Sequence, residues 1–387
     1  MDSYGLILNE DTQKIISVDP VSAYIFCCLE ERMLFSEIID SLKTDLSFDH
    51  NEAVLRAEGF LNVCHEHYLF DDDEAAPPRP SRPSVDSINL GHNPGYEALS
   101  DPIFARVLDT LFRIEIPRND VRRQLEELLE SRRAEAASAD VQITVSQLED
   151  ALVLSVNGVE SERFEDIDEA IPFIKSTLST TAINRYDFDA CFHAAVVATG
   201  TAAILLPGQS GAGKSCLTVA LTHAGFKCIT DETAILNFRN LEIWGVPLPC
   251  CVKKSGWDYT ERRFPEIATA TTYKRVDGKD VRYIAIADQD AASRGWGTEL
   301  IVFPNFNHAG DVGIRQMHRT EALELTLKNC IALRSELTPA VLDHLIVWIK
   351  RADAFRISYG PDDDPVAMVK KLIDQRRIVT KNEQTTI

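Results

Sequence analysis

The sequence lacks any apolar run that approaches the ~20 residues a membrane-spanning helix requires. One of its longest apolar runs is confined to residues 202–207. The first residues, Met1–Gly5, include no basic residue, whereas a secretory signal begins with a basic segment. We therefore expect a cytoplasmic protein with no signal peptide and no membrane partner.

Positive charge is also scarce. The 387 residues include 40 Lys and Arg against 60 Asp and Glu, for a formal net charge of −20. Residues 1–76 alone carry 17 acidic and 4 basic residues. Because a nucleic-acid partner requires a basic surface to meet its phosphates, this balance argues against one. It leaves room for a nucleotide, which needs only a local site.

The nine cysteines form no C-x-x-C pair, and their number is odd. Both features argue against a disulfide scaffold and against a zinc site. Since hydrophobic residues make up 45% of a long chain, a core can form without disulfide bonds or a bound metal ion. We expect reduced thiols, most of them buried, at Cys27, Cys28, Cys64, Cys191, Cys216, Cys228, Cys250, Cys251 and Cys330.

The chain is long enough for two or three domains, and one boundary stands out. Residues 71–84 combine a run of acidic residues with four prolines, which favours an extended linker over packed structure. We predict an N-terminal domain over 1–74, a linker over 75–90 and a second domain over 91–375. Within the second domain, the nucleotide-binding core is predicted to span about 186–360.

The N-terminal domain shows a clear order of elements. Apolar segments at Leu6–Leu8 and Lys14–Val18 flank a polar turn, which predicts a β-hairpin. Asp19, directly before a proline, is a helix-capping residue and predicts a first helix. Ser36 and Asp49 are predicted to cap a second and a third helix. A hairpin followed by three helices is a winged-helix-like plan.

The order of the hairpin, "VDPVSAYIF", "FSEIIDSL" and "AEGFLNVCHEHYLF" resembles the PqqD family of peptide-binding domains. The resemblance covers the N-terminal domain and rests on pattern. It implies that this domain binds the leader of a ribosomally made precursor peptide, which adds as a strand to the edge of the hairpin. The alternative is a winged-helix module used for packing, or for dimerisation in a homo-oligomer.

Apolar patterns with strand and helix periods continue after the linker. Asn157-Gly158 is a strong signal for a tight turn at the end of a strand. Strands are predicted at 112–116, 141–145 and 151–156, and helices at 117–135 and 167–178.

The most specific signal is Gly208–Ser215, which reads GQSGAGKS and matches the phosphate-binding pattern G-x-x-x-x-G-K-[ST]. A strand is predicted before it, at 202–206, and a helix after it, at 215–224. Glycines let backbone N–H groups turn toward phosphates, and the helix N-terminus adds partial positive charge. Lys214 would reach the β- and γ-phosphates of ATP, and the Ser215 hydroxyl would ligate Mg²⁺. The predicted nucleotide-binding residues are Gly208, Gln209, Ser210, Gly211, Ala212, Gly213, Lys214, Ser215 and Cys216.

Two acidic residues follow the next predicted strand, at 226–230. Asp231 and Glu232 stand where that strand ends, and acids at the carboxyl end of a strand suit Mg²⁺ binding or base catalysis. The alternatives are a solvated turn or a helix cap on Thr233.

Upstream of the phosphate loop, His193 lies in an apolar segment. It is either a core residue or part of the site.

The run "FHAAVVATGTAAILLPGQSGAGKSCLTVALTHAGFKCITDETAIL" resembles HPr kinase/phosphorylase and its relatives, which share a fold with phosphoenolpyruvate carboxykinases. In this resemblance His193 is the histidine before the nucleotide strand, Asp231 is the base toward the acceptor hydroxyl and Glu232 helps to hold the metal. Cys216 departs from the family, which usually has Glu there, and the acidic pair is Asp-Glu rather than Asp-Asp. Because the glycine-rich signature of the phosphorylase reaction is also missing, a kinase acting on another hydroxyl fits better.

A cation is expected near the transferred phosphoryl group, whose developing charge it would neutralise. Lys253 follows a proline-rich turn and aligns loosely with a lysine of the related kinases. Lys253 is therefore the candidate for this cation, and the alternative is that it is a solvated surface residue. The rival candidates are Lys254, Arg262, Arg263 and Arg282.

The predicted fold class is α+β and α/β: a winged-helix-like PqqD domain joined to a mixed-sheet P-loop kinase domain. The two resemblances together imply an ATP- and Mg²⁺-dependent kinase that phosphorylates a Ser or Thr hydroxyl of a leader-tethered ribosomal peptide. The predicted catalytic residues are Asp231, His193 and Lys253, and the predicted metal ligands are Ser215 and Glu232. Three alternatives stay open: a small-molecule kinase, an ATP-gated peptide chaperone without transfer, and a nucleotidyl transferase.

Overall fold

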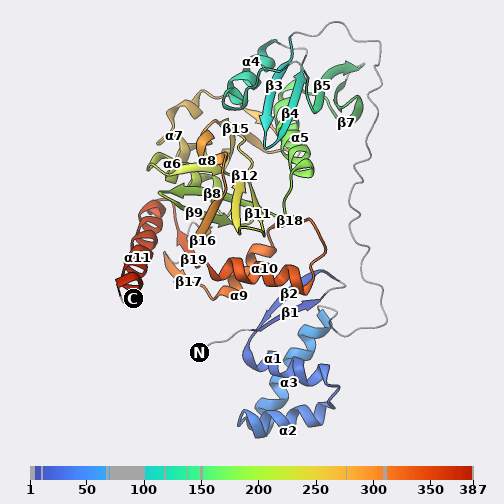
Figure 1. Ribbon diagram of the computed structural model, residues 1–387, viewed down its shortest axis with the longest axis vertical. Coiled ribbons are helices and arrows are strands. Elements are labelled where there is room, and N and C mark those ends of the chain that lie inside the picture. Colours follow the sequence, from blue (N-terminus) through green and yellow to red (C-terminus); the bar gives the residue numbers. More distant parts are fainter. Residues whose placement is uncertain are drawn as a thin grey trace. The chain divides into compact units, whose positions relative to one another are not determined.

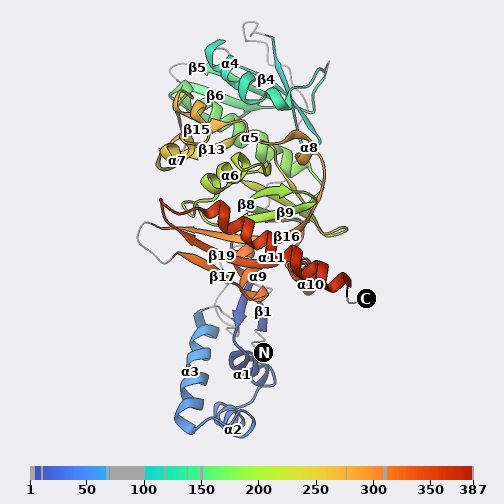
Figure 2. The same ribbon diagram turned by 90° about the vertical axis from the view of Figure 1, so that its left-hand side faces the viewer.

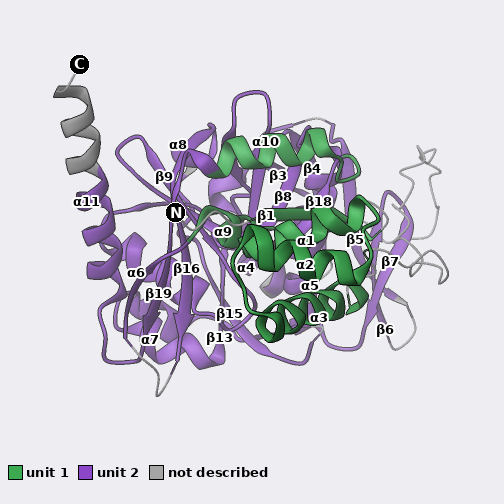
Figure 3. Cartoon of the chain, turned by 90° about the horizontal axis from the view of Figure 1, so that it is seen from below, with its two compact units in different colours: residues 1–85, 318–328, 335–349 green, residues 86–317, 329–334, 350–387 purple. Residues whose placement is uncertain are grey.

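The computed structural model describes residues 5–9, 12–66, 69, 101–116, 119–136, 138–148, 151–275, 277–307 and 312–385. The chain forms two compact units (Figure 3). Unit 1 comprises residues 1–85, 318–328 and 335–349, and unit 2 comprises residues 86–317, 329–334 and 350–387. The linker predicted over 75–90 lies outside the described residues. No helix in the described part of the chain is long and apolar enough to cross a membrane.

Unit 1 begins with the predicted hairpin and three helices (Figure 1). The two hairpin strands pair antiparallel, with Gly5 opposite Val18. The Asp19 carboxylate caps the first helix, because it accepts hydrogen bonds from two backbone N–H groups of the first turn at 2.9 and 3.1 Å. The elements are β1 (Gly5–Asn9), β2 (Lys14–Val18), α1 (Pro20–Glu30), α2 (Phe35–Asp45) and α3 (His50–Glu66).

The second helix does not begin at the predicted cap. Ser36 lies inside α2 and Leu34 is the residue that flanks its start, so the prediction of a Ser36 cap is wrong. The Glu37 carboxylate accepts the backbone N–H of Leu34 at 2.7 Å and satisfies a donor at the helix start. Asp49 caps α3 as predicted, by accepting the N–H of Glu52 at 2.8 Å. The core beneath the helices includes Ile25, Ile38, Leu42, Ala57 and Phe60.

Two helices from the C-terminal half of the chain belong to the same compact unit as the hairpin. They are α9 (Arg319–Leu327) and α10 (Pro339–Lys350). Helix α9 contacts β2. The Gln13 side chain in the hairpin turn donates to the Leu337 carbonyl at 3.4 Å and accepts the Leu337 N–H. The hairpin is therefore bonded to a segment 324 residues further along the chain.

Unit 2 starts with a five-stranded sheet of order β3-β4-β5-β6-β7 in the part of the chain described. The Asn157-Gly158 turn joins β6 to β7, and both residues have positive φ, +51° and +78°, as this tight turn requires. Helix α5 packs on β3, β4 and β6. The predicted strands and helices of this region are present, although α4 ends earlier and α5 ends later than predicted. The elements are β3 (Ile103–Val107), β4 (Thr110–Glu115), α4 (Asn119–Leu128), β5 (Val141–Leu148), β6 (Ala151–Val156), β7 (Val159–Phe164) and α5 (Ala170–Arg185).

The central sheet of unit 2 has nine strands among the described residues and is mixed, as predicted. Strand β9 runs antiparallel to β8 and parallel to β16, which in turn runs parallel to β19. The carboxyl ends of β9, β16 and β19 therefore meet at one edge of the sheet. The strands are β8 (Ala190–Thr199), β9 (Ala202–Pro207), β10 (Lys227–Thr230), β11 (Thr233–Asn237), β12 (Glu242–Gly245), β16 (Trp296–Phe306), β17 (Gly313–Gln316), β18 (Cys330–Leu333) and β19 (Asp353–Tyr359).

Helix α6 (Lys214–His223) lies between the central sheet and a small sheet of order β13-β15-β14 (Figure 2). Leu217 and Leu221 of α6 are buried in the core of the central sheet, and Val219 is buried with Cys250 and Val252 of the small sheet. Apolar contacts on two faces thus hold the helix in place. The remaining elements are β13 (Cys250–Lys253), β14 (Tyr273–Lys274), β15 (Asp280–Ile284), α7 (Trp257–Glu261), α8 (Gln289–Ala292), α11 (Pro365–Thr385) and the 3₁₀ turns Glu130–Arg132, Ile167–Glu169, Lys254–Gly256 and Pro265–Ala268.

All nine cysteines lie in the described part of the chain, and all are free thiols. Most are buried, as predicted. Cys27 is exposed, whereas Cys216 and Cys330 are partly exposed.

Candidate functional site

The predicted phosphate loop connects β9 to α6, so the strand–loop–helix context expected from the sequence is confirmed. Gly211 and Gly213 both adopt a φ of +95°, which residues with a side chain rarely take. The Ala212 N–H donates to the Gln209 carbonyl at 3.2 Å and closes the turn. Because Lys214 begins α6, the loop ends at the positive end of a helix dipole.

Two strand ends fix the position of the loop. Phe306, at the end of β16, donates its N–H to the Ala212 carbonyl at 3.2 Å. Tyr359, at the end of β19, donates its hydroxyl to the Gly213 carbonyl at 3.4 Å. A Cβ added to Gly213 would lie 2.5 Å from this hydroxyl and 3.1 Å from the Cβ of Phe306. Glycine is therefore required at this position by the close approach of the sheet as well as by its φ.

Lys214 is buried, with 6% of its surface exposed. Its Nζ donates to the carbonyls of Gly208 and Gln209, the latter at 3.1 Å. Burial, together with the charge of Lys253, lowers the pKa of Lys214 to about 8, while nearby acidic groups act in the opposite direction. A buried ammonium bonded to neutral carbonyls is well placed to receive an anion.

Lys253, at the end of β13, donates from Nζ to the Ser210 Oγ in the loop. This candidate cation therefore bonds directly to the loop. Three of the four rivals have other partners. Lys254 pairs with a carboxylate at 3.0 Å. Arg263 and Arg282 each hold the guanidinium carbon 4.0 Å from the centroid of an aromatic ring.

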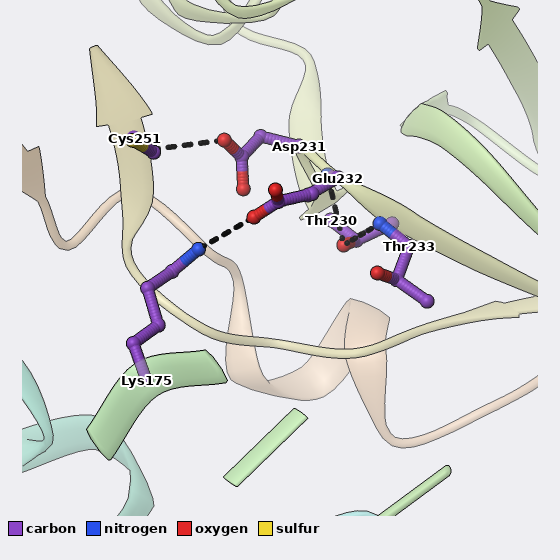
Figure 4. Close-up of polar contacts among 6 residues, drawn as sticks. All are labelled: Lys175, Thr230, Asp231, Glu232, Thr233 and Cys251. Atoms are coloured by element: carbon purple, nitrogen blue, oxygen red, sulfur yellow. Dashed lines mark hydrogen bonds and ion pairs between the residues drawn. The ribbon is translucent and has the colours of Figure 1, made fainter. Parts of the chain in front are cut away.

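Asp231 and Glu232 directly follow β10 and precede β11, which starts at Thr233. A helix cap on Thr233 is therefore excluded. Asp231 is buried, with 5% of its surface exposed, and so is not a solvated residue. The Asp231 Oδ2 accepts the backbone N–H of Cys251 at 2.9 Å (Figure 4). Burial raises the pKa of Asp231 above its usual value; Lys175 opposes this shift and Glu232 reinforces it.

Glu232 forms an ion pair that the sequence does not predict. Lys175, on α5, places its Nζ 2.8 Å from the Glu232 Oε2 (Figure 4). The charge of Lys175 lowers the pKa of Glu232 to about 2, so the carboxylate is ionised. Burial by itself would lower the pKa of Lys175, but Glu232 and Asp231 raise it well above its usual value. Lys175 lies 57 residues before its partner, and no motif in the sequence marks it.

His193 lies on β8, which pairs with β11. Its backbone N–H donates to the Asn329 carbonyl at 2.7 Å, and the backbone N–H of the next residue, Ala194, donates to the Glu232 carbonyl at 3.1 Å. Burial lowers the pKa of His193 and the charge of Lys214 lowers it further, whereas Glu232 opposes the shift. The imidazole is therefore neutral at pH 7 and shares the electrostatic environment of the loop lysine and the acidic pair.

Arg275 is a second cation that the sequence does not identify. It follows β14 and pairs with Asp277 at 3.3 Å. Although burial acts to lower it, the pKa of Arg275 is raised by nearby groups, which include the Cys251 thiol and the carboxylates of Asp277 and Glu232. The positive charge of Arg275 also acts on Glu232 and lowers the pKa of that carboxyl.

Cys216 is a packing residue. A Cβ added to Gly256 would lie 2.7 Å from the Cys216 Sγ, so the thiol closely approaches the turn that precedes α7. Burial raises the pKa of Cys216 to about 11, and the side chain is a neutral thiol at pH 7. Contact between Cys216 and a nucleotide stays a prediction.

The donor groups at the loop fit Mg²⁺ in combination with phosphates. No group of three or more His, Cys, Asp or Glu side chains that could hold a metal occurs among the described residues. Mg²⁺ does not require one, because it binds one or two carboxylates and completes its shell with waters and substrate phosphates. Glu232 meets this requirement, since its carboxylate is ionised and its side chain is 40% exposed. Ser215, in the first turn of α6, offers a hydroxyl oxygen beside Lys214.

Comparisons with known proteins assign no family to this chain. No model of a protein family matches the sequence, and no curated protein matches it. Among solved structures, the Hpr(Ser) kinase/phosphatase from Coxiella burnetii matches with 12% sequence identity and a TM-score of 0.27. The match covers 51% of this chain and 95% of that chain. A likeness at this level establishes neither a shared activity nor a shared site.

Proposed function

We propose that this protein is an ATP- and Mg²⁺-dependent phosphotransferase. The observation that carries the proposal is that a buried lysine in a phosphate loop and an acidic pair, of which Asp231 is buried and Glu232 partly exposed, belong to one electrostatic cluster. The charges of Asp231 and Glu232 act on Lys214, and those of Lys214 and Glu232 act on His193. Phosphoryl transfer needs both parts of this cluster, because it requires positive charge around the phosphates and a base for the acceptor.

The loop would bind the nucleotide. Its backbone N–H groups would hold the phosphates, and the Lys214 ammonium would exchange its carbonyl partners for the β- and γ-phosphates. Glu232 and Ser215 would hold Mg²⁺, which neutralises phosphate charge when bound. Lys253, already bonded to Ser210 in the loop, would stabilise the charge on the transferred group.

Asp231 is the proposed base. Its raised pKa makes the carboxylate a better proton acceptor, and the bond from the Cys251 N–H fixes its orientation. In the transfer step the acceptor oxygen attacks the γ-phosphorus, the bond to the bridging oxygen breaks, and ADP leaves. The proton of the acceptor hydroxyl passes to the Asp231 carboxylate. His193, which is neutral, would contribute a hydrogen bond rather than a charge.

The proposed acceptor is a Ser or Thr hydroxyl of a ribosomally made precursor peptide whose leader binds unit 1. Within the described residues the β1–β2 hairpin is a two-stranded sheet, so its edges can accept an extended peptide as a further strand. Tethering would raise the concentration of the acceptor near the loop. Because residues 1–76 are strongly acidic, we expect a leader with basic residues, whose binding weakens as salt increases.

A small-molecule kinase is the second candidate, and the packing of the hairpin favours it. The contact of β2 with α9 and the bonds of Gln13 to Leu337 give the hairpin a structural role without any ligand. In this case the N-terminal helices stabilise the enzyme and bind no peptide. This candidate would be favoured if the protein phosphorylated a small molecule at a rate that peptide competitors did not change.

The test uses γ-labelled ATP, Mg²⁺ and low-molecular-weight peptides from the source cell. Wild type and Asp231→Asn are compared, and Asp280→Asn serves as the control because Asp280 pairs with Lys254 and not with a residue of the loop. The proposal predicts label in a small peptide with wild type and the control, and none with Asp231→Asn. Binding of ATP by all three proteins without any labelled product would refute phosphoryl transfer.

A further inference from the structure

Lys175 presents a cation to the proposed metal ligand. The residue lies on α5, and its side chain is only 13% exposed, whereas that of Glu232 is 40% exposed. Its stem lines a small cavity together with Leu128, Leu178 and Tyr283. Its Nζ leaves this apolar surrounding and reaches the Glu232 Oε2 at 2.8 Å (Figure 4). The apolar packing of the stem therefore holds the ammonium against the carboxylate.

We propose that Lys175 is a positioning residue that pairs with Glu232 and that a metal ion must displace. This inference rests on the proposed function, because it assumes that Glu232 is the metal ligand. Lys175 keeps the carboxylate oriented before nucleotide binds, and it raises the metal concentration at which the site fills.

The displacement follows from the coordination chemistry. Mg²⁺ binds oxygen at about 2.0–2.1 Å and tolerates little distortion. A metal ion at that distance from the Glu232 carboxylate would stand within a few ångströms of the Lys175 ammonium, where repulsion between the cations is strong. The phosphates of ATP add both oxygen ligands and negative charge, and they favour the exchange of ammonium for metal.

Lys175 has partners to which it can turn when it leaves Glu232. Its Nζ lies 5.6 Å from the centroid of the Tyr283 ring, which is within the range of a cation–π contact. The negative charge of Asp231 also acts on it. The displaced ammonium would therefore not be left as an unpaired charge in a buried place, which would be costly.

The test measures binding of Mn²⁺ to the full-length protein without nucleotide, because electron paramagnetic resonance reports the free ion. Lys175→Met removes the competing cation and is expected to bind Mn²⁺ at least about tenfold more tightly than wild type. Lys175→Arg keeps the cation and should stay near the wild-type affinity. Lys175→Gln is measured beside Lys175→Met, and circular dichroism identifies which of them is folded.

Equal or weaker Mn²⁺ binding by a folded Lys175→Met or Lys175→Gln variant would overturn the proposal. Lys254→Met is the matched control, because it removes a lysine from an ion pair of similar length, 3.0 Å, that is more exposed. An equal gain in the control would also contradict the proposal, since it would reveal a general effect of net charge.

Glu232→Gln separates this inference from the proposed function. Loss of Mn²⁺ binding in Glu232→Gln, with no gain in Lys175→Met, would refute the role of Lys175 and leave Glu232 as the metal ligand. Wild-type Mn²⁺ binding by Glu232→Gln would refute the assignment of the metal ligand, and the role of Lys175 would fall with it.

Discussion

Replacing Gly213 with alanine tests the description of the phosphate loop in energetic terms. Gly213 has a φ of +95°, and an L-residue in a left-handed conformation costs about 1–2 kcal/mol. The new Cβ would also lie 2.5 Å from the Tyr359 hydroxyl and 3.1 Å from the Cβ of Phe306. Overpacking of this kind costs about 1–3 kcal/mol. We therefore expect Gly213→Ala to lower the free energy of unfolding by about 2–5 kcal/mol.

Gly211→Ala is the matched control for this substitution. Gly211 has the same φ of +95°, but a Cβ added to it has no atom within 4 Å. Gly211→Ala should lower the free energy of unfolding only by the cost of the left-handed conformation, about 1–2 kcal/mol. Urea unfolding followed by circular dichroism measures both variants, and their difference isolates the close approach of the sheet. Tyr359→Phe in the Gly213→Ala background should recover part of the loss, because it removes the contacting hydroxyl.

Equal losses in the two alanine variants would refute the close approach of Tyr359 to the loop. Unchanged stability in both would refute the left-handed conformation of the two glycines. ATP affinity offers a parallel measurement, since a Cβ at Gly213 must displace either the loop or the strand ends that hold it. Gly213→Ala should therefore bind ATP more weakly than Gly211→Ala.

Three further predictions concern other parts of the chain. Asp231→Asn should lower the transfer rate about 10²–10⁴-fold while the protein still binds ATP, because the proposed base is lost and the phosphate loop is kept; rapid-quench kinetics and calorimetry measure the two. Asp19→Ala should destabilise α1 by about 1 kcal/mol, since two backbone N–H groups lose their acceptor, and hydrogen exchange over α1 would show no change if the cap were unimportant. Iodoacetamide at mildly alkaline pH should label the exposed Cys27 well before Cys216, whose burial raises its pKa to about 11; the reverse order in peptide mass spectrometry would contradict the described packing.

Features whose determinants lie close together in the sequence were predictable. The phosphate loop needs glycines, a lysine and a hydroxyl at fixed spacing between a strand and a helix, and all of these occur within residues 202–224. The Asp19 cap likewise depends on the next few residues. The prediction of a Ser36 cap was wrong because the Glu37 carboxylate accepts the Leu34 N–H at the start of the helix. The helix therefore begins at Phe35, one residue before the serine.

Contacts between distant segments were not predictable, because they depend on how whole elements pack. Lys175 stands on a helix that precedes the nucleotide-binding strands, and only the packing of α5 brings its ammonium to Glu232. The bonds of Gln13 to Leu337 and the parallel pairing of β9 with β16 join segments with no shared sequence pattern. Sequence patterns therefore predicted the loop and the acidic pair, but not the ion pair between Lys175 and Glu232.

The central claim is transfer of the γ-phosphoryl group of ATP. Its most direct test supplies ATP labelled at the γ-phosphate in one reaction and at the α-phosphate in another, each with Mg²⁺ and low-molecular-weight peptides from the source cell. Phosphoryl transfer predicts a product labelled from the γ-position alone, and no labelled product with Asp231→Asn. Label from the α-position would instead indicate nucleotidyl transfer, and a product labelled equally by wild type and Asp231→Asn would contradict the proposed base.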